Sequence, residues 1–314
     1  MNFMKAPLAM RGGVNPSRLY LPREGQWPDL LSFLLERFPY MPAEIIEARL
    51  AAGEIVNAAG EPYHRHSAFV PDSWLWYYRE VPDEVEVPFE LDILYQDRHL
   101  LVVDKPHFLA SIPSGRYLHE TALSRLRKQL NRPEISPIHR LDRETAGVLV
   151  FSLRAEDRGA YQSLFQGRHV EKYYEAIAPT VATLNFPVVH QSHITKSPQY
   201  FTMIEVDKAP NSETVIELLQ RGERFSHYGL KPLSGKKHQL RVHMNALGMP
   251  ICHDNFYPVL APERAADDFS NPLQLLARAI GFRDPITGAA HFFESQRNLD
   301  LLALIHERQD VNHE

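Results

Sequence analysis

The chain has 314 residues, of which 44% are hydrophobic, so it is long enough for two domains and for a sizeable core. Its net charge of -5 at pH 7 argues against a protein that binds nucleic acid through its overall field. The longest apolar runs, such as residues 100–103, are too short to span a bilayer, and the start of the chain lacks the basic-then-apolar order of a secretion signal. A single cysteine, Cys252, rules out a disulfide within the chain, and we expect a cytoplasmic protein.

The first part of the chain predicts an arm and a small module. Residues 1–28 contain Gly, Pro and Asn without a period, which predicts an irregular N-terminal arm. Residues 29–85 predict a small α/β module, with helices and then strands expected at 30–38, 45–50, 54–57 and 74–78. The acidic stretch 81–88 is bounded by prolines and predicts a linker.

Residues 86–305 predict the main domain, followed by a tail at 306–314. Strands are expected at 100–103, 148–151, 172–177, 214–219, 228–233 and 273–282. Helices are expected at 123–130, 155–165 and 301–305, together with one that carries Leu240, Met244 and Leu247 and ends at Gly248. This alternation predicts an α+β fold in which helices pack on a mixed sheet.

The stretch from Ile138 to Phe151 places Asp142 between Arg140 and Arg143, just before an apolar run. Nearby positive charge favours the ionised carboxylate. Gly147 lets the backbone approach a ligand or another segment closely. Taken alone, the pattern also fits a surface ion pair.

Basic residues gather between residues 221 and 245. They are opposed there only by Glu223, and they comprise Arg221, Arg224, Lys231, Lys236, Lys237 and Arg241. A basic patch on an acidic protein suits a phosphate-backbone partner met at one face, and a solvated surface is the alternative interpretation.

Three segments with polar residues beside apolar strands resemble one family. Residues 138–151 (IHRLDRETAGVLVF), 172–176 (KYYEA) and 234–243 (SGKKHQLRVH) are similar to the motifs HRLDxxTSGLLVF, KxYxA and TGRxHQxRVH of the RluA-type pseudouridine synthases. The resemblance extends to residues 92–97 and 103–106 and to Gly248–Ile251 with Asp254 and Tyr257. It implies the pseudouridine synthase fold, with a mixed, mostly antiparallel sheet and flanking helices.

The resemblance implies an isomerase that turns uridine in RNA into pseudouridine without a cofactor. Asp142 matches the family's essential aspartate, which either attacks the anomeric carbon or removes a ribose proton. Arg241 matches the arginine that pairs with it, and Tyr174 the tyrosine whose ring stacks on the base and whose hydroxyl assists proton removal. Leu275 matches an apolar residue that packs on the target base.

The implied partner is structured RNA, with ribosomal RNA favoured over transfer RNA because residues 29–85 resemble the small αL-type RNA-binding module. Whether this module binds RNA stays open, since Glu44 and Glu47 would repel phosphate. The phosphate contacts are expected from Arg140, Arg143, Arg168, Lys236 and Lys237. We expect a monomer with no membrane and no metal.

Three other functions are possible interpretations of these residues. A metal-dependent hydrolase would draw on His190 and His193, or on His253 beside Asp254, but these do not form a complete three-ligand motif. A serine hydrolase would need Gly-x-Ser-x-Gly, which does not occur. A non-catalytic RNA-binding protein of the same fold is the more serious alternative, and it predicts that Asp142 is dispensable.

Overall fold

The computed structural model describes residues 6–81, 84–199, 201–302 and 305. The chain splits into two compact units, one taking in the described residues up to Glu84 together with Ser124–Pro133, and the other the remainder. The predicted division into arm, module, catalytic domain and tail stays a prediction, and the tail at 306–314 lies outside the described residues. None of the helices in the described part of the chain combines the length and apolar character of a membrane span.

The first unit contains two helices and a three-stranded antiparallel sheet in the order β1–β3–β2. Its elements are β1 (Ser17–Leu21), α1 (Leu30–Arg37), α2 (Ala43–Ala51), β2 (Ile55–Asn57) and β3 (Ser73–Tyr77). The expectation of an irregular arm is wrong for β1, which pairs with β3 along its whole length. This strand depends on a partner more than fifty residues away, so its own composition gives little sign of it.

The second unit is built on an eleven-stranded sheet in the order β10–β9–β11–β12–β8–β13–β7–β5–β4, with β14 on β13 and β6 on β7. Its strands are β4 (Asp92–Gln96), β5 (Leu100–Lys105), β6 (Ser136–Pro137), β7 (Ala146–Ser152), β8 (Val170–Pro179), β9 (Val188–Lys196), β10 (Met203–Val206), β11 (Ser212–Gln220), β12 (Phe225–Pro232), β13 (Leu275–Arg283) and β14 (Ala290–Glu294). The three later helices of the chain are α3 (Ala122–Leu130), α4 (Arg158–Gln166) and α5 (Gln239–Ala246). The pair β13–β7 is parallel and the other pairs are antiparallel, which confirms the expected mixed, mostly antiparallel sheet.

The parallel pair β13–β7 depends on Gly147. Its φ is +111°, and an added Cβ would stand 2.2 Å from the carbonyl oxygen of Ala277 on β13. A side chain at this position would therefore clash with the backbone of the neighbouring strand. The sequence left open whether the backbone at Gly147 approaches a ligand or another segment. In the structure it approaches another segment, the strand β13.

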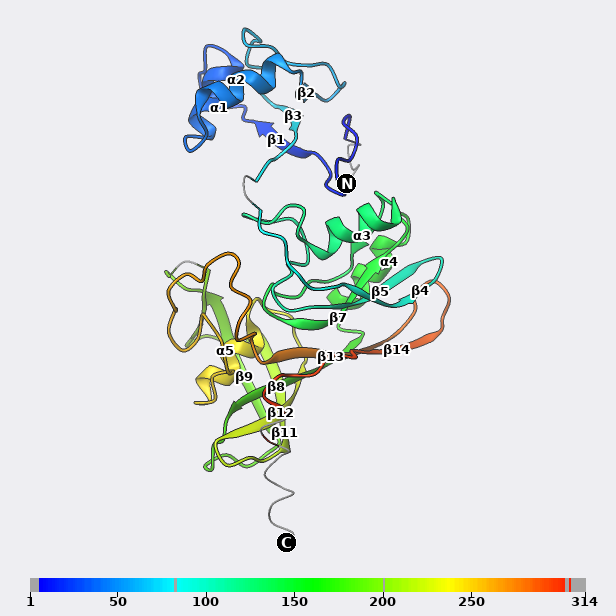
Figure 1. The fold of residues 1–314 in the computed structure, drawn as a ribbon, viewed down its shortest axis with the longest axis vertical. Helices are drawn as coiled ribbons and strands as arrows, with labels where there is room; N and C mark the ends of the chain where they lie inside the picture. Colours follow the sequence, from blue (N-terminus) through cyan, green and yellow to red (C-terminus); the bar gives the residue numbers. More distant parts are fainter. Residues whose placement is uncertain (1–5, 82–83, 200, 303–304, 306–314) are drawn as a thin grey trace. The chain divides into compact units, whose positions relative to one another are not determined.

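Two helices cover different parts of the large sheet (Figure 1). Tyr161 of α4 packs with Leu100 of β5 and Val148 of β7, whereas Leu240 and Met244 of α5 pack on β8, β11 and β12. The sequence missed β9, β10 and β14. Each carries polar and exposed side chains in alternation with half-buried ones, so the apolar signal in the chain is weak there.

Candidate active site

Asp142 lies in the turn between β6 and β7, and its side chain is 27% exposed. The buried Lys105 at the end of β5 fixes the backbone of this turn, since its Nζ donates to the carbonyl oxygen of Arg143 at 3.2 Å. The same ammonium donates to the carbonyl oxygens of Pro106 and Leu109. Burial lowers the pKa of Lys105 to about 7.

Two more side chains from the segment after β5 hold the same turn. Nδ1 of His107 lies 2.6 Å from the carbonyl oxygen of Glu144. Ser111 accepts from the backbone N–H of Leu141 at 3.0 Å and donates to its carbonyl oxygen at 2.7 Å. The backbone on both sides of Asp142 is therefore tied to one neighbouring segment, which restricts where the carboxylate can go.

The start of α5 is anchored to β11 through Gln239. Its side-chain nitrogen donates to the carbonyl oxygen of Glu213 at 2.9 Å and to the hydroxyl of Thr214 at 3.0 Å. Its side-chain oxygen accepts from the hydroxyl of Ser234 at 2.8 Å. These bonds set the position of the first turn of α5, which carries Arg241.

Arg241 connects two carboxylates. Its Nε and Nη2 donate to Asp254 at 2.7 and 2.5 Å, and its Nη1 lies 3.5 Å from Oδ2 of Asp142. The side chains of Arg241 and Asp254 are 2% and 0% exposed. Burial alone would lower the pKa of Arg241, but the hydrogen bonds to Asp254 outweigh it and raise that pKa. The expected pairing of Arg241 with Asp142 is present at longer range, and the close partner is Asp254.

His238 is a neighbour of Asp142 to which the sequence assigned no role. It precedes α5 with a φ of +55°, and its Nε2 lies 3.8 Å from Oδ2 of Asp142. Its Nδ1 lies 3.0 Å from the hydroxyl of Tyr257, and its ring stacks on Phe256. Burial lowers the pKa of His238 to about 4, so the ring is neutral at pH 7. The sequence pointed to His238 only through its position in the matched segment 234–243.

Asp142 is kept ionised by its surroundings. Burial alone would raise its pKa, but His238, Arg241 and Arg140 outweigh burial and hold the pKa below its usual value. Because His238 is itself neutral at pH 7, the two arginines supply the positive charge at that pH. The carboxylate is therefore negative, partly exposed and next to a rigid cation.

Tyr174 and Leu275 form an apolar wall. Tyr174 on β8 is half-buried, and burial followed by the charge of Asp142 raises its pKa, so its hydroxyl is protonated at neutral pH. Leu275 on β13 pairs with Ala176 of β8, is 3% exposed, and belongs to the apolar cluster against which Tyr174 packs. The two residues lie on neighbouring strands, and their contact with a base stays a prediction.

Four of the five predicted phosphate-binding residues have exposed side chains, and the fifth, Arg143, does not. Arg140 and Lys237 are exposed and act electrostatically on Asp142. Lys236 and Arg168 are also exposed, Arg168 beside Lys172.

Arg143 differs from the others, because its guanidinium pairs with Glu144 at 2.5 Å and lies over the ring of Tyr117 at 4.9 Å. Its charge is therefore partly satisfied within the protein.

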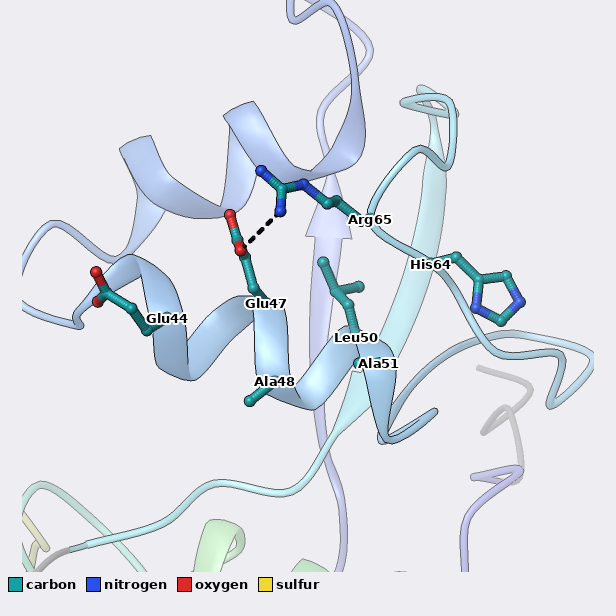
Figure 2. A pocket seen from close by; sticks show the side chains of 7 residues that line it. All are labelled: Glu44, Glu47, Ala48, Leu50, Ala51, His64 and Arg65. Atoms are coloured by element: carbon teal, nitrogen blue, oxygen red, sulfur yellow. Dashed lines mark hydrogen bonds and ion pairs between the residues drawn. The ribbon is translucent and has the colours of Figure 1, made fainter.

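A hollow on the first unit has a different character. It is lined in part by Glu44, Glu47 and Arg65. Figure 2 shows Arg65 facing Glu47, with an Nη1–Oε2 distance of 3.0 Å, while Glu44 points away from both. With two carboxylates against one guanidinium, this hollow offers no net positive charge to a phosphate.

The chain is similar to known RNA pseudouridine synthases. A family model described as RNA pseudouridylate synthase matches residues 99–246. The chain is 33% identical over 231 residues to the dual-specificity RNA pseudouridine synthase RluA of Haemophilus influenzae, covering 68% of this chain and 97% of that protein. It is 32% identical over 211 residues to the protein of the same name from Escherichia coli K12, covering 65% and 92%.

Two solved human structures are also similar. RNA Pseudouridylate Synthase Domain Containing 4 has a TM-score of 0.51 at 26% identity, covering 66% of this chain and 88% of that chain. RNA Pseudouridylate Synthase Domain Containing 1 has a TM-score of 0.53 at 24% identity, covering 70% and 95%, and supports the fold alone.

Proposed function

This chain belongs to the RluA-type family of RNA pseudouridine synthases and is an RNA-modifying isomerase, and we propose that Asp142 is its essential catalytic group. The observation that carries this proposal is the arrangement of Arg241 between Asp254 and Asp142. Asp254 takes two donors of the guanidinium, and Asp142 receives the third at 3.5 Å. Asp142 is thus oriented by a cation without being fully neutralised by it.

The reaction needs an ionised carboxylate near the ribose and no cofactor. The bond between C1′ and N1 breaks, the base turns, a bond forms between C1′ and C5, and the hydrogen on C5 leaves as a proton. Asp142 serves this sequence either by attacking C1′ or by removing a ribose proton. Its lowered pKa and its partial exposure support both roles.

Three neighbouring side chains complete the proposed site. Tyr174 stacks on the base, and its protonated hydroxyl relays the C5 proton by accepting it while passing its own proton to water. Leu275, which is 3% exposed, packs with Tyr174 in the core and would support its ring from the apolar side. His238 stays neutral at pH 7 and so orders the space next to Asp142 without adding a second positive charge beside it.

The substrate is a uridine in structured RNA, which must leave its stack or pair at a cost of roughly a few kcal/mol. The exposed Arg140 and Lys237 near Asp142 would offset part of this cost through phosphate contacts, with Lys236 and Arg168 further out. We favour ribosomal RNA over transfer RNA, because residues 29–85 resemble a small RNA-binding module and the described ones up to Glu84 belong to the first compact unit. We also place the protein in the cytoplasm as a monomer, and its single cysteine supports the location.

The test uses RNA carrying tritium at C5 of uridine, because isomerisation releases that label to water. Wild type is expected to release tritium, and Asp142→Asn to release it about 10³-fold more slowly while keeping its thermal unfolding midpoint and its affinity for RNA. Equal release by both proteins would remove Asp142 from catalysis. Mapping pseudouridines in total RNA with and without the gene identifies the RNA, and sites lost only from transfer RNA would contradict the ribosomal assignment.

A further inference from the structure

Three side chains that commonly bind metals meet on the far side of α5 from the chemistry described above. They are His190 of β9, Glu205 of β10 and His243 of α5, and their nearest ligand atoms all lie within 4.8 Å of one another. Nε2 of His190 is 2.9 Å from Oε1 of Glu205, and Nε2 of His243 is 3.9 Å from the same oxygen. The sequence offered His190 with His193, whereas the fold groups His190 with two residues from other elements.

The ring of His243 is held in the orientation that a metal ligand requires. Its Nδ1 lies 2.9 Å from the hydroxyl of Thr214, and its side chain is 0% exposed. With the proton on Nδ1 and donated to Thr214, Nε2 directs its lone pair toward Glu205 and the hydroxyl of Ser192 at 3.1 Å. Metal-bound histidines are usually oriented by such a bond from the second ring nitrogen.

Ser212 faces the same nitrogen. Its hydroxyl is 3.0 Å from Nε2 of His243 and donates its own hydrogen to the carbonyl oxygen of Ser192 at 2.7 Å, so it can only accept a hydrogen bond from a protonated Nε2. Zinc at Nε2 would therefore replace that proton and its hydrogen bond, as well as the contact with Ser192. The hydroxyl of Ser192 or a water is then close enough to take a fourth position.

We propose that His190, Glu205 and His243 form a zinc-binding site. Two imidazole nitrogens and one carboxylate oxygen are a ligand set that zinc accepts, with a fourth position left for water or a hydroxyl. In a tetrahedral site with bonds of about 2.1 Å, neighbouring ligand atoms stand about 3.4 Å apart. The two distances to Glu205 lie on either side of that value, and the nitrogens of His190 and His243 lie within 4.8 Å of each other, so both rings and the carboxylate would shift slightly to close around the metal.

Zinc at this site would tie α5 to β9 and β10, which already pair with each other in the sheet. The helix α5 carries Arg241 two residues before His243. The site is therefore structural and separate from the cofactor-free isomerisation. This proposal departs from the expectation of a protein without metal, and a bound structural zinc leaves the reaction itself unchanged.

The test measures zinc binding by the full chain, expressed without a histidine tag and stripped with a chelator. Calorimetric titration with zinc is expected to show one site per chain, and thermal unfolding is expected to shift to higher temperature with zinc but not with magnesium. His190→Gln and Glu205→Gln should each weaken binding at least about tenfold and abolish the shift. Both positions are half-buried, and circular dichroism checks that the variants fold.

His193→Gln is the matched control, because His193 lies on the same strand and is outside the cluster. It should bind zinc as wild type does. The proposal is overturned if wild type binds no zinc, if His190→Gln and Glu205→Gln bind it as tightly as wild type, or if His193→Gln weakens it equally. Tritium release by the metal-free protein is measured in parallel, so a failure of this site and a failure of the enzymatic assignment are distinguished.

Discussion

Arg241 binds Asp254 more closely than it binds Asp142. The two contacts to Asp254 measure 2.7 and 2.5 Å, and Oδ1 of Asp254 also accepts from the backbone N–H of Phe256 at 2.8 Å and of Tyr257 at 3.2 Å. This arginine is therefore fixed by a fully buried carboxylate before any substrate arrives. It has a structural role as well as the proposed role beside Asp142.

Replacing Arg241 should affect stability and turnover together. Arg241→Ala leaves Asp254 buried without its cation, which is expected to lower the free energy of unfolding by about 3–5 kcal/mol and to abolish tritium release. Adding Asp254→Asn removes the unpaired charge, so the double variant should recover part of that stability but no turnover. If turnover returned with stability, the arginine would be structural only. Denaturant unfolding and tritium release, measured on the same preparations, separate the two effects.

The hydroxyl of Tyr174 is expected to contribute to turnover and its ring to binding. Tyr174→Phe should lower kcat about 10- to 100-fold with KM unchanged, because it removes the protonated hydroxyl that relays the C5 proton to water. Tyr174→Leu should also raise KM, because it removes base stacking worth about 1–3 kcal/mol. Steady-state kinetics with a short RNA containing the target provides both constants. Full activity of Tyr174→Phe would eliminate the hydroxyl as an essential base.

Lys237 is expected to contact phosphate near the target uridine. Lys237→Ala should weaken RNA binding and reduce the slope of log K against log salt by about one, because one phosphate contact is lost. Lys231→Ala is the control, since Lys231 is already paired with Glu217 at 2.9 Å. Filter binding at several salt concentrations measures both slopes. An equal change in the two variants would indicate a general effect of net charge.

Stability should fall as the pH drops below about 6.5, the usual pKa of an exposed histidine. Burial lowers the pKa of His139 to about 3 and those of His107 and His238 to about 4. Between pH 6.5 and those values, the unfolded chain takes up protons that the folded protein excludes, so the free energy of unfolding decreases. Each such histidine adds a slope of about 1.4 kcal/mol per pH unit at most.

His139→Gln tests this pH dependence, because a glutamine can still accept the hydrogen bond from the backbone of Val150. Urea unfolding of wild type and variant from pH 7 to pH 4.5 should give a shallower slope for the variant. Parallel curves would show that His139 titrates alike in the folded and unfolded states.

The amino-acid sequence was enough to predict the family, the general fold and the residues proposed to carry the reaction. Asp142, Tyr174 and Arg241 each lie within a short motif, and β5 and β7 are continuous apolar runs, so both kinds of signal are local in the chain. The edge strand β10 and its neighbour β9 escaped prediction because half-exposed strands carry a weak apolar pattern.

The hydrogen bonds that hold these residues in place could be seen only in the tertiary structure. Lys105 and Ser111 reach the Asp142 turn from more than thirty residues away, and Asp254 takes the closer share of Arg241. The grouping of His190 with Glu205 and His243 likewise joins residues of three elements. Contacts of this kind depend on which strands and helices become neighbours. Local periodicity and spacing do not predict which elements those are.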